Sequence, residues 1–580
     1  MPTIVNFLSF ITTRRGRSSS LSSTSSLSSS PEQQPLLHHR YRRRIQQQQQ
    51  QEQKRNQNVS LPIFDMTVWT IAAALLSCLG GFLFGFDLGV VGGLFIAPSF
   101  QTHFGIDPND KIREADINGN IVAVLQIGCL VGSLAATTTA DKLGRKWSIT
   151  IAAAIFTLGG ILQIIGDGLS MLYAGRLIAG FGVGAMSMLV PVYVAEIAHQ
   201  NQRGVLGGLW QFFIAAGLAM SYWTNYAVQS HVNHTDNALW RIPLIVQLVP
   251  GVIMLIGMPF LFETPRCLCA QEKVDRARVV VSRIRGLDVN DPKVEKEIQQ
   301  IQSGILLLQE SLTNAASRRG GGKLAGWRLV FSKQNRRRLL IGSALQMFQQ
   351  LTGTNIINYF SPQIYRSIGL SSNTAELLAT GVYGLVKMSV TLIGFSCLVD
   401  RYGRRKLLIG GGVAQSLSLI SVAICAGVRP PSTMTDGPIH PASYAAIAFL
   451  YIFAVFFSMS WGPIPWLYCS EIYPMWMRAK STAVTTAINW ILNAAVGKFS
   501  PLLLVSSTWG TFVFYGLWNV VMAVFCLIFV PETKGKTLEE MDMLFSYNRS
   551  VINDGEESVI SEEQLQPQEE RIVKSSQSKN

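Results

Sequence analysis

The segment Arg338–Tyr365, RLLIGSALQMFQQLTGTNIINYFSPQIY, has the length of a membrane span but is unusually rich in amides. About 20 apolar residues cross a hydrocarbon core of roughly 30 Å, and Gly353 interrupts this run. Residues three and four apart share one helix face. Buried amides are costly in lipid unless they are paired, so such a face normally meets a bundle interior or a water-filled cavity. The amides are Gln346, Gln349, Gln350, Asn355 and Asn358.

An uncharged face of donors and acceptors suits a neutral polyhydroxylated ligand, because amides and sugar hydroxyls both donate and accept hydrogen bonds. The structural alternative is that these amides only hydrogen-bond neighbouring helices to one another. Their clustering beside a glycine favours the cavity, because interrupted helices line the substrate sites of many transporters.

The composition indicates an all-α polytopic membrane protein. Apolar residues make up 48% of the chain and charged residues 14%, against about 25% charged residues in soluble domains. The charges gather at the two ends and in one middle segment, so the net charge of +14 indicates cytosolic loops and excludes nucleic acid as a partner. The eight cysteines form neither a disulfide pattern nor a metal-ligand pattern, and we expect no metal and no cofactor.

Apolar runs predict about twelve spans in two sets of six. They lie near 67–96, 117–139, 147–166, 170–191, 206–228 and 241–262, and then near 338–362, 375–399, 407–427, 443–469, 480–505 and 509–530. The Lys/Arg-rich loops all fall on one side, which predicts that both termini are cytosolic. The expected parts are a disordered basic, Ser- and Gln-rich tail (1–66), an N-terminal half (67–264), a cytosolic helical linker (265–336), a C-terminal half (337–532), a cytosolic helix (533–546) and a disordered tail (547–580).

Two helix starts and one modification site can be predicted outside the spans. Asp291 and Pro292 are typical of an N-cap and first position, with the helix running to about Gln309. Thr537–Glu540 is a capping box that opens a last helix. Asn233 begins a glycosylation sequon on the predicted outer side.

The two halves repeat each other in sequence. DKLGRKWSI from Asp141 recurs as DRYGRRKLLI from Asp400, PVYVAEIAHQNQRG recurs as PWLYCSEIYPMWMRAK, and ETPR recurs within PETKGK. Internal duplication around a midplane site is the plan of secondary transporters. These motifs, together with GFDLGVVGG, GRLIAGFGVG and QQLTGTN in this order, resemble sugar porters of the major facilitator superfamily over about residues 67–545. The low-complexity tails and PETKGKTLEE resemble a fungal member.

The resemblance implies the major facilitator fold and proton-coupled uptake of a monosaccharide by alternating access, most often in the plasma membrane. It also implies that an aromatic plate at Trp466 covers the apolar face of a sugar ring, although a tryptophan near Pro463 and Pro465 could equally serve core packing. The residues that it places on the substrate path are Gln211, Gln349, Gln350, Asn355, Trp466 and Asn489, with Gln346 nearby.

Two charged residues within predicted spans are candidates for function. Asp87 is the only acid in the first span, and a lone intramembrane acid typically moves a proton or an ion. Arg176, at the start of the fourth span, is its best partner, so that protonation of Asp87 would release Arg176; the alternative is a fixed structural ion pair. The resemblance supports proton coupling, because sugar porters with Asp at this position resemble proton symporters.

Lys387, near the middle of the eighth predicted span, departs from a purely neutral site. A mid-membrane lysine needs a partner or water. It could bind the carboxylate of a sugar acid or a quinate-like substrate, or it could fix the bundle or snorkel to the interface.

Matched charges recur at the helix ends of both halves and predict a cytosolic gate. The resemblance implies salt bridges that hold the outward-facing state; the alternative is that these charges only set topology. An exposed pair is worth about 0–1 kcal/mol, so only a network could bias a conformational equilibrium of a few kcal/mol. The residues are Asp141, Arg145, Glu196, Arg203, Glu263 and Arg266 in one half and Asp400, Arg404, Arg405, Glu471, Arg478 and Glu532 in the other.

Two other classes of function fit these residues less well than transport does. A non-transporting nutrient sensor of the same fold would signal through its tails, which carry no obvious docking motif. An enzyme is disfavoured because the sequence offers no nucleophile–base or metal constellation. The expected partners are therefore a small sugar, a proton and the lipid bilayer.

Overall fold

The computed structural model describes residues 67–199, 203–233, 235–317, 327, 330–332, 335–370, 373–397, 399–428, 440–474, 477–534 and 545. Every regular element within these residues is a helix, which confirms the predicted all-α class. The predicted capping box at Thr537–Glu540 and both predicted disordered tails lie outside the described residues, as does the end of the predicted linker between 318 and 326.

The N-terminal half consists of α2 (Val68–Phe95), α3 (Pro98–His103), α4 (Lys111–Leu143), α5 (Arg145–Ile165), α6 (Leu169–Ile197), α7 (Arg203–His231), α8 (Ala238–Gly257) and the 3-10 turn η5 (Met258–Phe260). The linker contributes α9 (Pro265–Ala270), α10 (Val274–Arg285) and α11 (Pro292–Ser317). The C-terminal half consists of α13 (Arg336–Gln350), α14 (Thr354–Ile368), α15 (Asn373–Cys397), α16 (Val399–Tyr402), α17 (Arg404–Val428), α18 (Pro441–Met459), α19 (Ile464–Ile472), α20 (Arg478–Ser506) and α21 (Thr508–Phe529).

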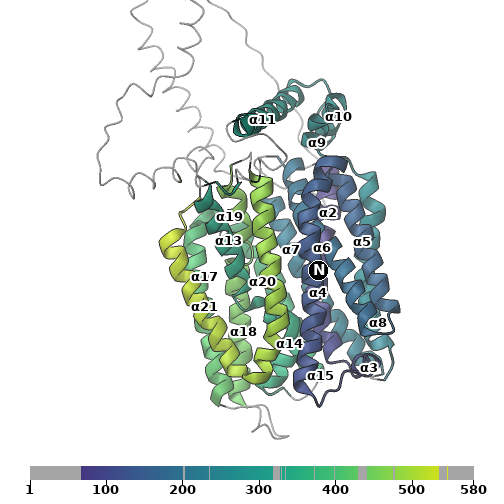
Figure 1. Cartoon of the computed structure of the whole chain (residues 1–580), viewed down its shortest axis with the longest axis vertical. Helices are drawn as coiled ribbons and strands as arrows, with labels where there is room; N and C mark the ends of the chain where they lie inside the picture. Colours follow the sequence, from purple (N-terminus) through teal and green to yellow (C-terminus); the bar gives the residue numbers. More distant parts are fainter. Residues whose placement is uncertain are drawn as a thin grey trace, which may run out of the picture. The chain divides into compact units, whose positions relative to one another are not determined.

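Ten stretches of the described helices are long and apolar enough to cross a membrane. The 29-residue α7 and the broken pair α13–α14 run in the same bundle and bring each half to six spans, as the sequence predicts (Figure 1). Helices α13 and α14 have 15 residues each, so neither is long enough to cross the membrane alone.

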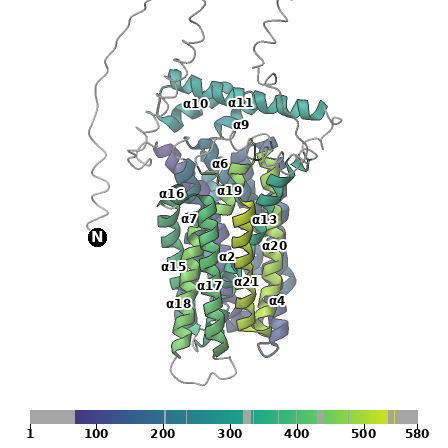
Figure 2. The ribbon, with the colours of Figure 1, turned by 90° about the vertical axis from the view of Figure 1, so that its left-hand side faces the viewer.

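The halves meet along three helix pairs: α4 with α20, α7 with α15, and α2 with α14. Small residues permit the close approach. A Cβ at Gly119 of α4 would lie 2.6 Å from the carbonyl oxygen of Lys498, and a Cβ at Gly384 of α15 would lie 2.9 Å from Cα of Ala219. We call the end of the bundle that carries α9–α11 the linker end and the other the opposite end (Figure 2).

The linker helix α10 is tied to the first span. Thr67 and Thr70, at the start of α2, both donate to the carbonyl oxygen of Ile284, at 2.9 and 3.1 Å. The predicted start of α11 is confirmed, because Asp291 Oδ1 accepts the backbone N–H of Lys293 at 2.8 Å. The helix continues to Ser317, beyond the predicted end near Gln309.

An ion pair joins the halves at the opposite end, and we expect it to favour closure there. Lys498 Nζ lies 2.5 Å from Asp116 Oδ1 and donates to Asn120 Oδ1 at 2.6 Å. The reversal Asp116→Lys should lengthen the distance between spin labels at Ile112 and Val505, with an effect of about fivefold or less on the closed population, because half-exposed pairs contribute about 0–1 kcal/mol.

The control for this prediction is the exchanged pair Asp116→Lys/Lys498→Asp, measured by the same electron–electron distance distribution. The exchanged pair should restore the short distance. If it behaves like the single reversal, the pair does not govern closure.

Candidate functional site

The amide-rich segment is interrupted at Gly353, as its sequence suggests. Gly353 has φ +93°, a conformation that favours glycine, and a Cβ there would lie 3.1 Å from Cβ of Tyr515. Helix α13 therefore ends at Gln350 and α14 begins at Thr354. The break orients the amides before and after it toward one interior space.

A second irregularity in α14 joins the two halves. Pro362 has no N–H to donate to the carbonyl oxygen of Asn358, four residues earlier. The hydroxyl of Tyr222, from α7 of the other half, donates to that oxygen instead at 2.8 Å. A buried carbonyl must find a partner, so the proline in one half creates a hydrogen-bonding site for the other.

A cavity of about 70 Å³ lies between the halves, and the predicted substrate residues gather around it. Typical small-molecule sites measure about 300–1,000 Å³, so a ring-sized substrate can enter only when the helices part. The predicted residues that line the cavity are Gln211, Gln349, Gln350, Asn355, Lys387, Trp466 and Asn489. Gln346 does not line it and lies directly behind, bonded to Asn489.

The amides on α13 are held by α20 and by the turn before α19. Asn489 Nδ2 donates to Gln346 Oε1 at 2.8 Å and to Gln349 Oε1 at 3.0 Å. Gln349 Nε2 donates in turn to the carbonyl oxygens of Trp461 and Gly462, at 2.9 and 2.8 Å. These bonds fix the orientation of the amides before any ligand binds, which reduces the entropy that binding must cost.

Lys387 is buried at the cavity and donates hydrogen bonds to neutral side chains. Its ammonium group donates to Thr354 Oγ1 at 3.2 Å and to Asn358 Oδ1 at 3.0 Å, and it lies 4.9 and 5.5 Å from the ring centroids of Phe457 and Tyr383. Among the described residues no carboxylate lies within 4.0 Å of it. Neutral dipoles and aromatic faces only partly replace water around a cation, so the site attracts an anion.

Asp87 and Arg176 meet as an ion pair inside the N-terminal half. Asp87 Oδ1 lies 2.6 Å from Arg176 Nη1 and also accepts from Gln247 Nε2 at 2.9 Å, and both charged side chains are at most 2% exposed. Asp87 Oδ2 has no hydrogen-bond partner among the described residues. Phe84 and Leu88, on either side of Asp87 in α2, line the cavity. A free carboxylate oxygen next to the cavity is suited to accept a proton.

Sequence reasoning missed a three-residue contact between the halves. Tyr359 accepts from Gln126 Nε2 at 2.8 Å and donates to Asn493 Oδ1 at 2.9 Å, while Asn493 Nδ2 donates to Gln126 Oε1 at 3.3 Å. The four-residue spacing from Asn489 could have revealed Asn493. Gln247 is a single amide in α8, and Gln126 lies six residues beyond Asn120 in the apolar part of α4. No pattern distinguishes either residue from an amide that only bonds neighbouring helices.

Residues 73–545 match the model of the family described as Sugar (and other) transporter. The chain belongs to this family of the major facilitator superfamily. The transporter is 33% identical over 488 residues to a protein named probable quinate permease from Neosartorya fischeri, covering 83% of this chain and 88% of the relative. It is 31% identical over 503 residues to the quinate permease of Neurospora terricola, with 85% and 91% covered.

The fold of this transporter is similar to solved structures of a proton symporter. The proton:xylose symporter XylE bound to 6-bromo-6-deoxy-D-glucose is 27% identical, with a TM-score of 0.67 over 82% of this chain and 99% of that one. XylE of E. coli in a partially occluded inward-open conformation is 26% identical with the same TM-score, covering 81% and 100%. The chain is therefore a multi-pass membrane transporter and not an enzyme.

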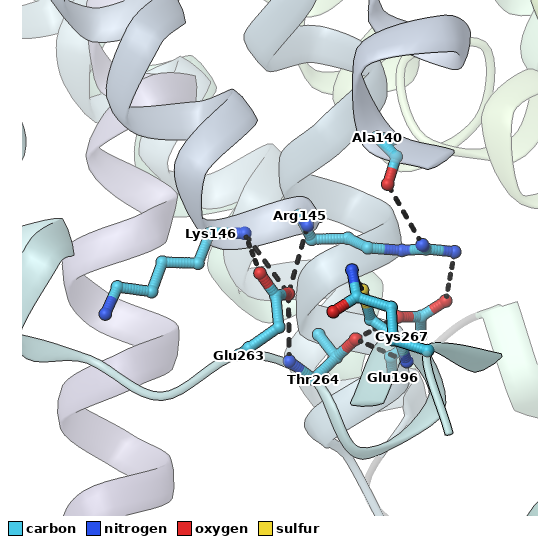
Figure 3. A network of polar contacts seen from close by, with 8 residues as sticks. Ala140, Arg145, Lys146, Glu196, Glu263, Thr264 and Cys267 are labelled. Carbon is cyan, nitrogen blue, oxygen red and sulfur yellow. Dashed lines mark hydrogen bonds and ion pairs between the residues drawn. The ribbon is translucent and has the colours of Figure 1, made fainter. Parts of the chain in front are cut away.

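At the linker end the transporter carries a charge network within its N-terminal half (Figure 3). Glu263 accepts the backbone N–H groups of Arg145 and Thr264, both at 3.0 Å, and of Lys146 at 3.1 Å. Arg145 Nη2 lies 3.2 Å from Glu196 Oε1, and Thr264 Oγ1 donates to Glu196 Oε2 at 2.6 Å. The network connects α5, α6 and the segment that follows η5.

The C-terminal half repeats these bonds and adds one, because the backbone N–H of Lys534 also donates to Glu532 at 3.0 Å. Glu532 accepts the backbone N–H groups of Arg404 at 2.9 Å, Arg405 at 3.1 Å and Thr533 at 3.0 Å. Arg404 Nη2 lies 2.9 Å from Glu471 Oε1, and Thr533 donates to Glu471 Oε2 at 2.5 Å.

An equivalent glycine in each network leaves space for the glutamate carboxylate. Gly144 and Gly403 have φ +91° and +86°, and a Cβ at either would lie 2.3 Å from Glu263 Oε2 or 2.6 Å from Glu532 Oε2. The glycine of the repeated D-x-x-G-R motif is therefore required by backbone conformation and by space.

The bonds described above for both networks each lie within one half. Arg478 Nε donates to the carbonyl oxygen of Tyr473 in its own half. Asp141 is exposed and Arg266 half-buried, and neither joins these bonds. The side chains of Arg203 and Asp400 lie outside the described residues. The gate role of the twelve residues remains a prediction.

The two equivalent glutamates should differ in their effect on stability. Burial raises the pKa of Glu263 despite its N–H partners. Burial also opposes ionisation of Glu532, but the N–H groups of Lys534, Arg404, Arg405 and Thr533 outweigh it and lower the pKa. At pH 7, Glu532→Gln should therefore lower the melting temperature of the purified transporter more than Glu263→Gln does.

The pH dependence follows from the same signs. Stabilisation by Glu532 is present above its ordinary pKa of 4.5 and is lost as the pH falls through its lower native value. Stabilisation by Glu263 is present below 4.5 and is lost as the pH rises through its higher native value. The difference in melting temperature between the two variants should thus decrease toward pH 4 in thermal unfolding scans. A larger fall in melting temperature for Glu263→Gln than for Glu532→Gln at pH 7 would contradict this assignment.

Proposed function

We propose that this transporter takes up a polyhydroxylated monocarboxylate of the quinate class together with a proton, by alternating access of the amide-lined cavity. The single observation that carries the proposal is Lys387, a buried cation at the cavity with no carboxylate within 4.0 Å among the described residues. A substrate carboxylate would supply the missing charge through a charge-assisted hydrogen bond. Two relatives named quinate permease support the same class.

The remaining cavity residues divide the recognition of such a ring. Gln211, Gln350 and Asn355 would exchange hydrogen bonds with hydroxyl groups, and Trp466 would cover the apolar face of the ring. Asn489 would hold the orientation of Gln349 through the bond described above. Recognition by several amides explains why a hydroxylated ring is favoured over a simple carboxylate.

Asp87 would carry the proton and Arg176 would respond to it. When Asp87 binds a proton at its unpartnered Oδ2, the attraction that holds Arg176 weakens and the packing between α2 and α6 can change. Co-transport of one proton with a monocarboxylate moves no net charge, so a membrane potential would neither drive nor oppose it. The similarity to a proton:xylose symporter supports proton coupling.

A neutral monosaccharide, which the sequence resemblance favours, is the second candidate substrate. The amides of the cavity are uncharged, and XylE, whose structure is similar, is named as a xylose symporter. Transport of a neutral sugar with a proton would move one positive charge. The two candidates therefore differ in their response to a membrane potential.

We place the linker end in the cytosol, with both termini there, and the protein in the plasma membrane. The linker carries α10 and α11 with many Lys and Arg residues, which favours the cytosolic side. In this orientation the two charge networks lie at the cytosolic mouth, and the ion pair Asp116–Lys498 lies at the outer end.

Uptake by a yeast strain that lacks its own transporters tests the proposal. The panel contains quinate, sugar acids, hexoses and pentoses, each with and without an uncoupler. Quinate-class acids should accumulate, should stop accumulating with the uncoupler, and should be taken up poorly by Lys387→Ala. Uptake of hexoses alone would select the second candidate, and binding without uptake would indicate a sensor.

A further inference from the structure

A second cavity, of about 560 Å³, lies in the N-terminal half at the linker end. Its walls are the junction of α4 and α5, the segment after α8, and the helices α9 and α10. It shares no lining residue with the amide-lined cavity. The site is thus separate from the proposed substrate path.

Cations outnumber acids in this cavity, and the acids are already engaged. The cations that line it are Lys146, Lys273, Arg276 and Arg283. Of the two lining acids, Glu263 accepts backbone N–H groups in the charge network, and Asp275 lies 3.0 Å from Arg278. Within the described residues, none of the four cations has a carboxylate within 4.0 Å. The described residues that line the cavity therefore carry an excess of positive charge.

Helix α10 turns one face toward the cavity. Arg276, Val279 and Arg283 are three, four and seven residues apart, a spacing that places them on the same side of a helix. Ala277 and Ile284 of the same helix are buried, and the bonds from α2 to Ile284 fix the helix in place. The two guanidinium groups thus extend from a rigid element.

Lys146 completes the charged wall from α5. Figure 3 shows that its backbone N–H contacts Glu263 while its ammonium group extends away from the network. The ammonium group lies 5.1 Å from the ring centroid of Trp147. Trp147 is 50% exposed and Leu143 is 48% exposed, and both line the cavity. The cavity thus combines an excess of cations with an apolar wall that extends from membrane helices.

We propose that this cavity binds the head group of an anionic phospholipid, with its phosphate between Lys146, Arg276 and Arg283 and its acyl chain along Trp147. Basic pockets beside membrane helices are suited to phosphorylated head groups. A soluble anion would use the cations but would leave the apolar wall exposed. The lipid would bridge α5 and α10 and thereby hold the linker against the N-terminal half.

Native mass spectrometry of the full chain tests this proposal without any transport measurement, so that its outcome is independent of the proposed function. The chain is released from phosphatidylcholine nanodiscs that contain a minor fraction of phosphatidylinositol 4-phosphate. The variant Lys146→Gln/Arg276→Gln/Arg283→Gln should retain this lipid about a hundredfold less, because each basic residue near an anionic surface contributes about fivefold.

The matched control is Lys142→Gln/Lys293→Gln/Lys296→Gln, which removes the same charge from exposed positions outside the cavity. The control should retain the lipid as the wild type does. Equal loss in both triple variants would indicate general surface attraction, and no loss in either would leave the cavity without this ligand; each result overturns the proposal. Displacement of the lipid by inorganic phosphate at equal concentration would assign a soluble anion instead and would also overturn it.

Discussion

Asp87→Asn should abolish concentrative uptake and leave exchange of substrate across the membrane intact. An amide at position 87 cannot take up and release a proton, so the pH gradient can no longer do work on the substrate. For one proton per substrate, each pH unit supports at most about a tenfold accumulation. The wild type should approach that ratio in vesicles with an imposed gradient, and the variant should stop at a ratio of one.

The control for Asp87→Asn makes the same chemical change at Asp107, which is exposed in the loop before α4. Asp107→Asn should accumulate substrate normally. Loss of one partner from a buried ion pair destabilises the folded protein by about 3–5 kcal/mol. The double variant Asp87→Asn/Arg176→Gln removes both charges, so it distinguishes loss of coupling from misfolding. Counterflow of labelled substrate measures exchange in all three. Concentrative uptake by Asp87→Asn would refute the proton role.

Lys387→Met should weaken binding of a quinate-class acid by about 10- to 150-fold. A hydrogen bond to a charged group contributes about 1.5–3 kcal/mol, and methionine retains the length and most of the apolar volume of the lysine. The variant should fold, because the substitution removes a buried charge that has no carboxylate within 4.0 Å in the described part of the chain. Equilibrium binding of labelled quinate to the purified protein measures the change.

Two comparisons make the Lys387 result specific. Lys406→Met makes the same substitution at an exposed position outside the cavity and should bind quinate normally. The neutral methyl ester of quinate should bind wild type and Lys387→Met within a few-fold of each other, because it offers no carboxylate. Equal weakening of the acid and the ester in Lys387→Met would mean that the lysine only maintains the packing of the cavity.

The sequence predicted the architecture well because its signals are local. Hydrophobic length defines a span, and ten of the twelve predicted runs each coincide with one described helix to within a few residues at most ends. The runs near 338–362 and 443–469 are each divided between two helices, α13 with α14 and α18 with α19. Gly353 correctly marked the break between α13 and α14, because a positive φ at that position requires glycine. The repeated motifs also corresponded to equivalent bonds around Glu263 and Glu532.

Contacts that depend on how the two halves pack could not be predicted from the sequence. The bond from Tyr222 to the carbonyl oxygen of Asn358 needs both a proline in α14 and a tyrosine placed opposite it in α7. The contact of Gln126 with Tyr359 spans 233 positions in the chain. The charged groups were identified as gate candidates, but the sequence did not indicate that their bonds would close within each half.

Accumulation of labelled quinate by the purified transporter in sealed vesicles, with an acidic exterior and a separately imposed membrane potential, tests the central claim most directly. We predict uphill accumulation that a protonophore abolishes and that an interior-negative potential leaves unchanged, because a proton and a monocarboxylate enter together. Quinate that only equilibrates, or that fails to enter while a neutral sugar accumulates in proportion to the potential, would contradict the account.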